Sequence, residues 1–207
     1  MGDDSSHIVS AGYHRVADRY EALEREEWPR VRRLRELLAL LPESFGVLDV
    51  GCGNGRPGLA TIAERHRATG IDISAVQSER ARQNVPEATV LQGDVLTTTF
   101  EESSFDAIVS FYAVEHIPRC RHPELFGSFF TWLRPGGRLL FTIEARARHD
   151  TVGEWLGEPM FFSQFSPQET LELIRAAGFE AISSELETQR EGDAEIEYAW
   201  ILARRPG

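Results

Sequence analysis

Short apolar runs alternate with amphipathic segments along the middle of this chain. Five runs have the composition of strands buried in a parallel sheet: 47–50, 68–72, 89–92, 105–111 and 138–143. Three segments among them have helical character: 57–66, 75–84 and 122–133. This alternation predicts an α/β fold in which helices cover both faces of a parallel sheet.

The two ends of the chain have different patterns. Residues 10–41 predict two helices with a break at Trp28-Pro29, and residues 1–9 predict a mobile start. Residues 145–166 are rich in aromatic side chains but have no repeat, so we expect a long irregular insertion there.

The C-terminal part predicts one helix and a hairpin. Ser166 and Glu169 form a capping box that starts a helix over 167–177. Residues 179–186 and 195–203 predict two strands that pair antiparallel at the edge of the sheet.

The first apolar run leads into a glycine-rich loop. Gly51, Gly53 and Gly55 stand at alternate positions, and Pro57 follows where a helix should begin. Glycines allow a tight turn and a close approach of the main chain to a ligand. The loop therefore predicts a nucleotide-like ligand at the carboxyl ends of the strands.

Three ligands could use such a loop: a nucleoside triphosphate, a dinucleotide or S-adenosylmethionine. A triphosphate loop needs a lysine, and this chain contains none. A dinucleotide loop needs a small residue where Arg56 stands. Neither of these ligands has a use for the carboxylate of Asp49. S-adenosylmethionine does, because it has a cationic amino-acid end.

Two more carboxylates follow expected strand ends. Asp72 lies 21 residues after Gly51, which is the distance at which a carboxylate meets a ribose. Asp94 ends the third run and could accept a hydrogen bond from an adenine amino group. With Asp49 they would line one crevice.

The chain resembles the class I S-adenosylmethionine-dependent methyltransferases. The matching segments, which fall within about residues 45–145, are Asp-x-Gly-x-Gly-x-Gly at 49–55, Gly-x-Asp at 70–72, Gly-Asp at 93–94, 105–110 and 133–139. The resemblance implies a Rossmann-like seven-stranded sheet with the last strand antiparallel. It implies S-adenosylmethionine as cofactor and S-adenosylhomocysteine as product. We interpret 1–44 as an N-terminal helical cap and 45–207 as the methyltransferase domain of one globular unit.

The expected donor site consists of the motif residues and their neighbours. These residues are Tyr20, Asp49, Gly51, Cys52, Gly53, Asp72, Ile73, Gln77, Asp94, Val95 and Ser110. Tyr20 is included because a tyrosine-rich N-terminal helix often closes over the donor in relatives.

Catalysis is expected just past the fourth strand. His116 titrates in the range useful to a general base, Glu115 could orient it, and Tyr112 could face the sulfonium. A structural role for His116 remains an open alternative, and Glu144 is a second candidate base.

The acceptor is expected to contact segments outside the common core. The candidates, which could also simply pack the lid onto the sheet, are Tyr13, Trp28, Glu144, Phe161, Phe162 and Phe165, with Met160 and Trp155 near them.

The composition of the chain argues against several classes of binding partner. The net charge of −11 argues against nucleic acid, and the arginine run at 30–35 is interpreted as the basic side of an amphipathic helix. The presence of only two cysteines favours a reducing compartment, the cytoplasm. No apolar run approaches the length of a membrane span. The histidines and cysteines lack the spacing of a metal site, so we expect no metal. A monomer or a homodimer fits equally well.

The leading function is methyl transfer to an O, N or C atom of a small metabolite. The alternatives are a protein or peptide methyltransferase and a non-catalytic domain that binds S-adenosylmethionine.

Overall fold

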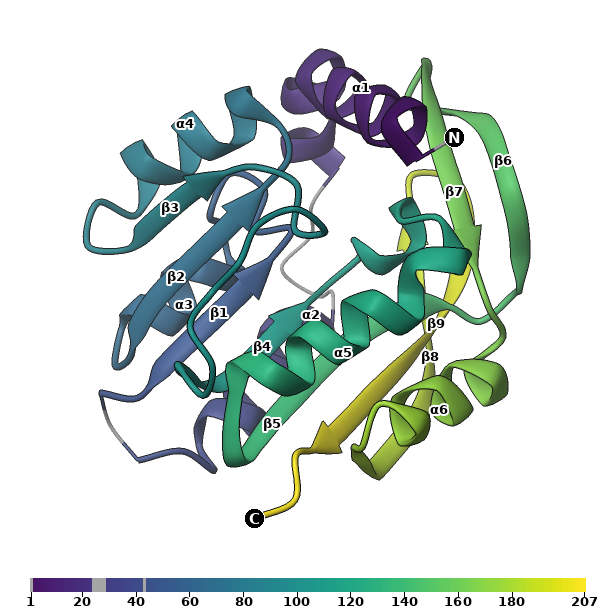
Figure 1. The fold of residues 1–207 in the computed structure, drawn as a ribbon. Coiled ribbons are helices and arrows are strands. Elements are labelled where there is room, and N and C mark those ends of the chain that lie inside the picture. The colour runs from purple at the N-terminus through teal and green to yellow at the C-terminus, as the bar shows by residue number, and fades with distance from the viewer. Residues whose placement is uncertain (1, 24–28, 43) are drawn as a thin grey trace.

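The computed structural model describes residues 2–23, 29–42 and 44–207. One seven-stranded sheet organises them (Figure 1), with the order β3 (Thr89–Gln92), β2 (Arg67–Asp72), β1 (Gly46–Val50), β4 (Phe105–Ser110), β5 (Leu133–Glu144), β9 (Ala194–Arg204) and β8 (Glu180–Glu191). The first five strands are parallel, and β9 runs antiparallel to both of its neighbours. The expected Rossmann-like sheet with its last strand antiparallel is confirmed.

Helices cover both faces of the sheet (Figure 1). The helices are α2 (Pro29–Leu38), α3 (Gly58–Ala63), α4 (Ala75–Asn84), α5 (His122–Trp132) and α6 (Pro167–Ala176). The side chains of β1 alternate between two cores: Leu48 and Val50 pack with residues of α5 and α6, and Val47 packs with residues of α2 and α3. A strand buried on both faces reads as the continuous apolar run seen in the sequence.

The arginines of α2 contact the sheet edge. The apolar side of the helix is buried, as the spacing predicted, with Leu34 fully covered. On the other side, Arg32 and Arg33 pair with Glu187 at 2.7 and 3.1 Å, and Arg33 also reaches Glu185 on β8. The basic run therefore neutralises acidic residues of the same chain.

The described part of the N-terminal segment is helical from residue 2, whereas the sequence predicted a mobile start and no helix before residue 10. Helix α1 spans Gly2–Leu23, and its Val9 is 5% exposed against Met160 and Phe161. Gly12 permits this close packing, because an added Cβ would lie 2.8 Å from Met160 Cε. Contacts with β7 thus hold a helix whose first residues are mostly polar.

The expected irregular insertion at 145–166 is wrong as well. It contains the hairpin β6 (Arg148–Trp155) and β7 (Glu158–Gln164), which stands beside α1 in Figure 1. Leu156 and Gly157 form its two-residue turn with φ values of 50° and 80°. Two positive φ values match the twist of a hairpin, but leucine rarely adopts one, so the turn had no sequence signal.

Two smaller differences concern element boundaries. Helix α3 stops at Ala63, short of the expected residue 66. The expected turn at 134–137 interrupts the pairing of β5, which passes from Phe105↔Leu133 to Ala107↔Arg138. The division into a cap and a domain at residue 44 stays an interpretation.

No helix in the described ranges combines the length and the apolar character that crossing a lipid bilayer requires.

Candidate active site

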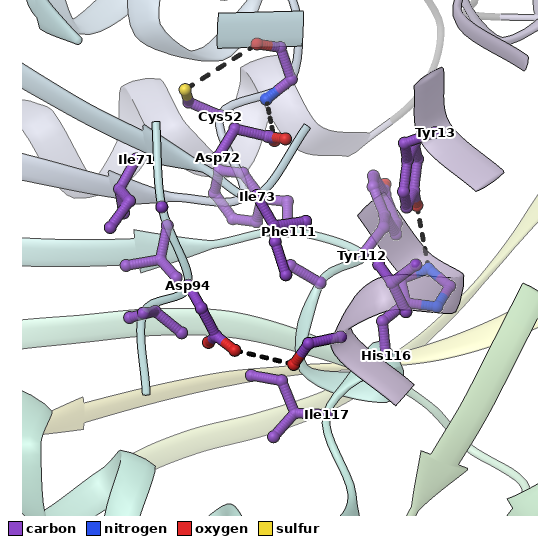
Figure 2. A pocket seen from close by; sticks show the side chains of 18 of the residues that line it. Tyr13, Cys52, Ile71, Asp72, Ile73, Asp94, Phe111, Tyr112, His116 and Ile117 are labelled. Carbon is purple, nitrogen blue, oxygen red and sulfur yellow. Dashed lines mark hydrogen bonds between the residues drawn. The ribbon is translucent and has the colours of Figure 1, made fainter. Parts of the chain in front are cut away.

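A deep pocket opens at the carboxyl ends of β1, β2, β3 and β4, and α1 covers it. Its empty space, including the mouth, is about 870 Å³. The wall combines main chain of the glycine loop with side chains from α1 and from the segment after β4 (Figure 2). This is the edge at which open α/β sheets bind their ligands.

The glycine loop presents bare main chain to the pocket. The N–H groups of Gly51 and Cys52 donate to the carbonyl of Ile71 at 2.8 and 3.2 Å, which anchors the loop to β2. Gly51 has φ of 75°, and a Cβ there would lie 2.5 Å from Ala113 Cβ. Gly53 also has positive φ, but no atom lies within 4 Å of its Cβ position, so the loop is open there.

Asp72 joins this loop to the end of β2. Its Oδ2 accepts from Gly53 N–H at 2.8 Å and its Oδ1 from Ser74 N–H at 2.9 Å. Burial raises the pKa of Asp72 to about 6, although both backbone hydrogen bonds act in the opposite direction. An ionised carboxylate has lone pairs for further donors, so Asp72 can still accept from a ligand.

Asp94 connects helix α1, which covers the pocket, to the end of the sheet. Its Oδ2 accepts from the Ser6 hydroxyl of α1 at 2.7 Å, and its Oδ1 accepts from Leu96 N–H at 2.9 Å (Figure 2). Asp94 is therefore both a turn residue and a pocket residue.

Asp49 lies behind the pocket wall and is 3% exposed. Burial raises its pKa to about 7, nearby Asp72 raises it further, and the charge of Arg30 lowers it. A buried carboxylate of this kind stabilises a cation that enters the neighbouring space.

Tyr112 leaves β4 in a left-handed conformation, with φ of 56°. Its N–H donates to Thr142 Oγ1 at 2.7 Å, and its hydroxyl donates to Gln189 Oε1 at 2.7 Å. These bonds hold a strained backbone whose side chain lines the pocket, a combination typical of functional sites.

His116 is locked as a neutral imidazole. Its Nδ1 must donate to the Phe161 carbonyl at 2.8 Å, so its Nε2 accepts from the Tyr13 hydroxyl at 2.9 Å (Figure 2). Burial lowers the pKa of His116 to about 4. Both nitrogens are occupied, and the ring orients Tyr13.

A second cavity adjoins the first, and we call it the aromatic chamber. Its rings belong to Tyr13, Tyr20, Tyr112, Tyr198, Trp155 and Phe162. His116 and two carboxyl groups, Glu115 and Glu191, complete its wall. The tyrosines of α1, Tyr112 and His116 line both cavities, so the two spaces adjoin at this shared wall.

Glu115 is the most unusual group in the chamber. It is 4% exposed, and its Oε2 has no hydrogen-bond partner among the described residues. Burial raises its pKa to about 8, and the charges of Glu191 and Glu144 raise it further.

The structure brings most of the expected site residues together. Those that line the pocket at the strand ends are Tyr13, Tyr20, Gly51, Cys52, Gly53, Asp72, Ile73, Asp94, Val95, Tyr112 and His116. Asp49, Gln77 and Ser110 are buried behind the wall, and Glu115 and Phe162 line the chamber only.

Three expected acceptor contacts lie outside both cavities. The Phe161 carbonyl accepts from His116, the Phe165 ring packs against the His122 ring, and Glu144 pairs with Arg148 at 3.2 Å. Trp28 lies outside the described residues.

Sequence reasoning missed Ser6, Arg30, Glu191 and Tyr198. Ser6 was assigned to a mobile segment, and Arg30 to a basic face. Glu191 and Tyr198 sit on the C-terminal hairpin, where only the pairing register shows which residues face the chamber.

No three His, Cys, Asp or Glu side chains within 2–23, 29–42 and 44–207 gather as a metal site would require. The expectation of no metal stays a prediction.

The free energy of unfolding of the ligand-free protein should fall by about 2 kcal/mol between pH 6.5 and 8. Glu115 and Asp49, with pKa values of about 8 and 7, bind protons more tightly than in the unfolded chain, so rising pH removes stability in this window. The lowered pKa values of His116 and His122 make the free energy of unfolding rise with pH, and most of this rise is complete by about pH 7. Urea unfolding at both pH values measures the fall. Glu115→Gln should remove more than half of it, and an unchanged fall in that variant would contradict the assignment.

The comparisons with known proteins agree with this site. A family model described as a methyltransferase domain matches residues 47–137. The malonyl-[acyl-carrier protein] O-methyltransferase of Herminiimonas arsenicoxydans is 29% identical over 194 residues, which cover 90% of this chain and 72% of that protein. The trans-aconitate 2-methyltransferase of Deinococcus radiodurans is 37% identical over 122 residues, which cover 56% of this chain and 44% of that protein.

A solved structure shares the whole fold. The 1,6-didemethyltoxoflavin-N1-methyltransferase of Burkholderia thailandensis, with 1,6-didemethyltoxoflavin and S-adenosylhomocysteine bound, superposes with a TM-score of 0.79. The match covers 100% of this chain and 91% of that chain at 19% identity. The family match spans the glycine loop and the acidic strand ends that form the pocket, and together with these relatives it supports a class I S-adenosylmethionine-dependent methyltransferase.

Proposed function

We propose that this methyltransferase acts on a small molecule whose acceptor atom enters the aromatic chamber. The observation that carries the proposal is the shared wall between the donor pocket and the chamber. Helix α1 and the β6–β7 hairpin contribute side chains that line the chamber. A small concave cavity suits a metabolite better than a segment of protein.

The donor pocket has the groups that S-adenosylmethionine requires. Asp72 would accept from the ribose hydroxyls, and Asp94 from the adenine amino group. The bare main chain at Gly53 allows close approach, and the buried charge of Asp49 favours the cationic amino-acid end. Tyr20, Cys52, Ile73 and Val95 complete the wall. When bound, the donor supplies an electrophilic methyl group on a sulfonium sulfur.

Two expected donor residues act indirectly in this proposal. Gln77 and Ser110 are 1% and 0% exposed. They support the wall from behind, as the neighbouring N-cap of α4 at Ser74 does. We therefore propose them as supports of the loop and of the end of β4.

Among the three residues expected to act in catalysis, the contacts favour Glu115 as proton acceptor. His116 has a lowered pKa and no free nitrogen, so we propose that it positions Tyr13. Tyr112 presents its ring at the shared wall. Alignment of the acceptor by these rings can supply much of the rate.

Incubation with methyl-labelled S-adenosylmethionine and a fractionated cell extract tests the proposed function. We expect label in low-mass molecules and none with heat-denatured protein. Label on proteins or peptides would support the alternative substrate class. No label anywhere, with S-adenosylhomocysteine binding intact, would indicate a binding domain.

A further inference from the structure

The rings of the aromatic chamber face one small space from several directions. The empty volume, which includes space open to solvent, is about 320 Å³. Tyr13, Tyr20 and Trp155 form a corner in which the ring centroids lie 5.3 to 5.8 Å apart, with interplanar angles of 55° to 79°. Tyr112 and Tyr198 form another pair at 4.8 Å and 69°. A π face of any of these rings that borders the space would attract a cation.

Two carboxyl groups share this space. Glu115 Oε2 is buried without a partner among the described residues, and such a charge is costly unless a proton or a cation accompanies it. Glu191 Oε1 accepts from Gln189 Nε2 at 2.6 Å and from the Tyr198 hydroxyl at 3.0 Å. Burial raises the pKa of both groups, because each carboxyl is costly to ionise in this space.

The neighbouring cations already have other contacts. No arginine is among the described residues that line the chamber. Arg148 stacks on Phe162 at 4.7 Å and pairs with Glu144 at 3.2 Å. Arg30 lines the donor pocket and lies 5.8 Å from the Tyr112 ring. The chamber itself therefore presents carboxyl oxygens and π faces.

We propose that the aromatic chamber is the acceptor subsite for a small primary or secondary amine that is cationic at neutral pH. The inference rests on the proposed function and names its substrate class. Rings at Tyr20 and Trp155 hold the ammonium group, and Glu115 binds it directly. The same two carboxyls disfavour an acceptor that carries a carboxylate.

The reaction balances with Glu115 as base. The ammonium group gives a proton to the Glu115 carboxylate, which frees the electron pair on nitrogen. The nitrogen then bonds to the methyl carbon while the methyl–sulfur bond breaks, and that electron pair stays on sulfur. The methylated amine and S-adenosylhomocysteine leave, and the proton passes from Glu115 to solvent.

Calorimetry on the protein saturated with S-adenosylhomocysteine tests this inference. The probes are n-butylamine, benzylamine and phenethylamine, each compared with the alcohol and the carboxylate that replace its amino group. At least one amine should bind about tenfold or more tightly than its alcohol, because charge-assisted hydrogen bonds and cation–π contacts are worth more than neutral ones. Carboxylates should bind weakest.

Two variants separate the chamber from general surface charge. Glu115→Gln should reduce the preference of that amine over its alcohol to within about threefold. Glu195→Gln, an exposed residue of β9 outside the chamber, should keep it. Alcohols or carboxylates that bind as well as amines would overturn the inference, as would no binding in any series. Either result, with labelled methyl still entering small molecules, would leave the proposed function standing.

Discussion

Replacing Glu115 by glutamine is expected to lower kcat/KM for the acceptor by about 100-fold or more, the usual contribution of a general base. Glutamine keeps the size and most of the hydrogen-bonding capacity of the side chain but cannot take a proton. Glu115 does not line the donor pocket, so affinity for S-adenosylhomocysteine should stay within about twofold of wild type. Steady-state kinetics with an acceptor from the labelling screen, together with calorimetry, measures both.

The matched control is again Glu195→Gln, which should retain wild-type kinetics. Folding failure does not complicate the comparison, because removal of a buried acid with a raised pKa should stabilise the ligand-free protein at pH 8. A Glu115→Gln enzyme with unchanged kcat/KM would show that the proton goes elsewhere, or that the nucleophile carries none.

Replacing Asp72 by alanine is expected to raise the Kd for S-adenosylhomocysteine by about 10- to 100-fold. Each hydrogen bond to a charged group is worth about 1.5–3 kcal/mol. The variant loses the ribose contact and also the anchors at Gly53 and Ser74 that shape the loop. Calorimetric titration measures the change.

Asp193→Ala provides a control for the Asp72 variant. Asp193 is fully exposed at the turn between β8 and β9, so its removal should leave donor affinity unchanged. An Asp72→Ala protein that melts cooperatively and binds S-adenosylhomocysteine as tightly as wild type would refute the ribose assignment.

The central sheet and the donor pocket could be predicted because their signals are local. Val47 to Val50 form a strand buried on both faces, so the sequence shows a continuous apolar run. Gly51 is required by its positive φ and by its contact with Ala113. Asp72 and Asp94 follow strands directly, and parallel strands bring their carboxyl ends to one edge.

The lid and the chamber could not be predicted because they depend on tertiary contacts. Residues 2–7 are glycine or polar, and the helix is held by Ser6 on Asp94 and by Val9 on β7. The β6–β7 turn places Leu156 at positive φ, which no propensity favours.

The chemistry of the chamber depended on register and burial. Tyr198 stands opposite Glu144 and Glu187 only because the β5, β9 and β8 strands pair as they do. The sequence predicted Glu115 as a residue that orients His116. In the proposed function their roles are exchanged, because burial raises the pKa of the acid and lowers that of the imidazole.

The wild-type titration that the Asp72 comparison needs is also the most direct test of the account as a whole. Folded protein titrated with S-adenosylhomocysteine should bind one molecule per chain, and saturation should raise the melting temperature. A folded protein that shows neither heat of binding nor thermal stabilisation, with either this compound or S-adenosylmethionine, would contradict the assignment of the pocket at the strand ends.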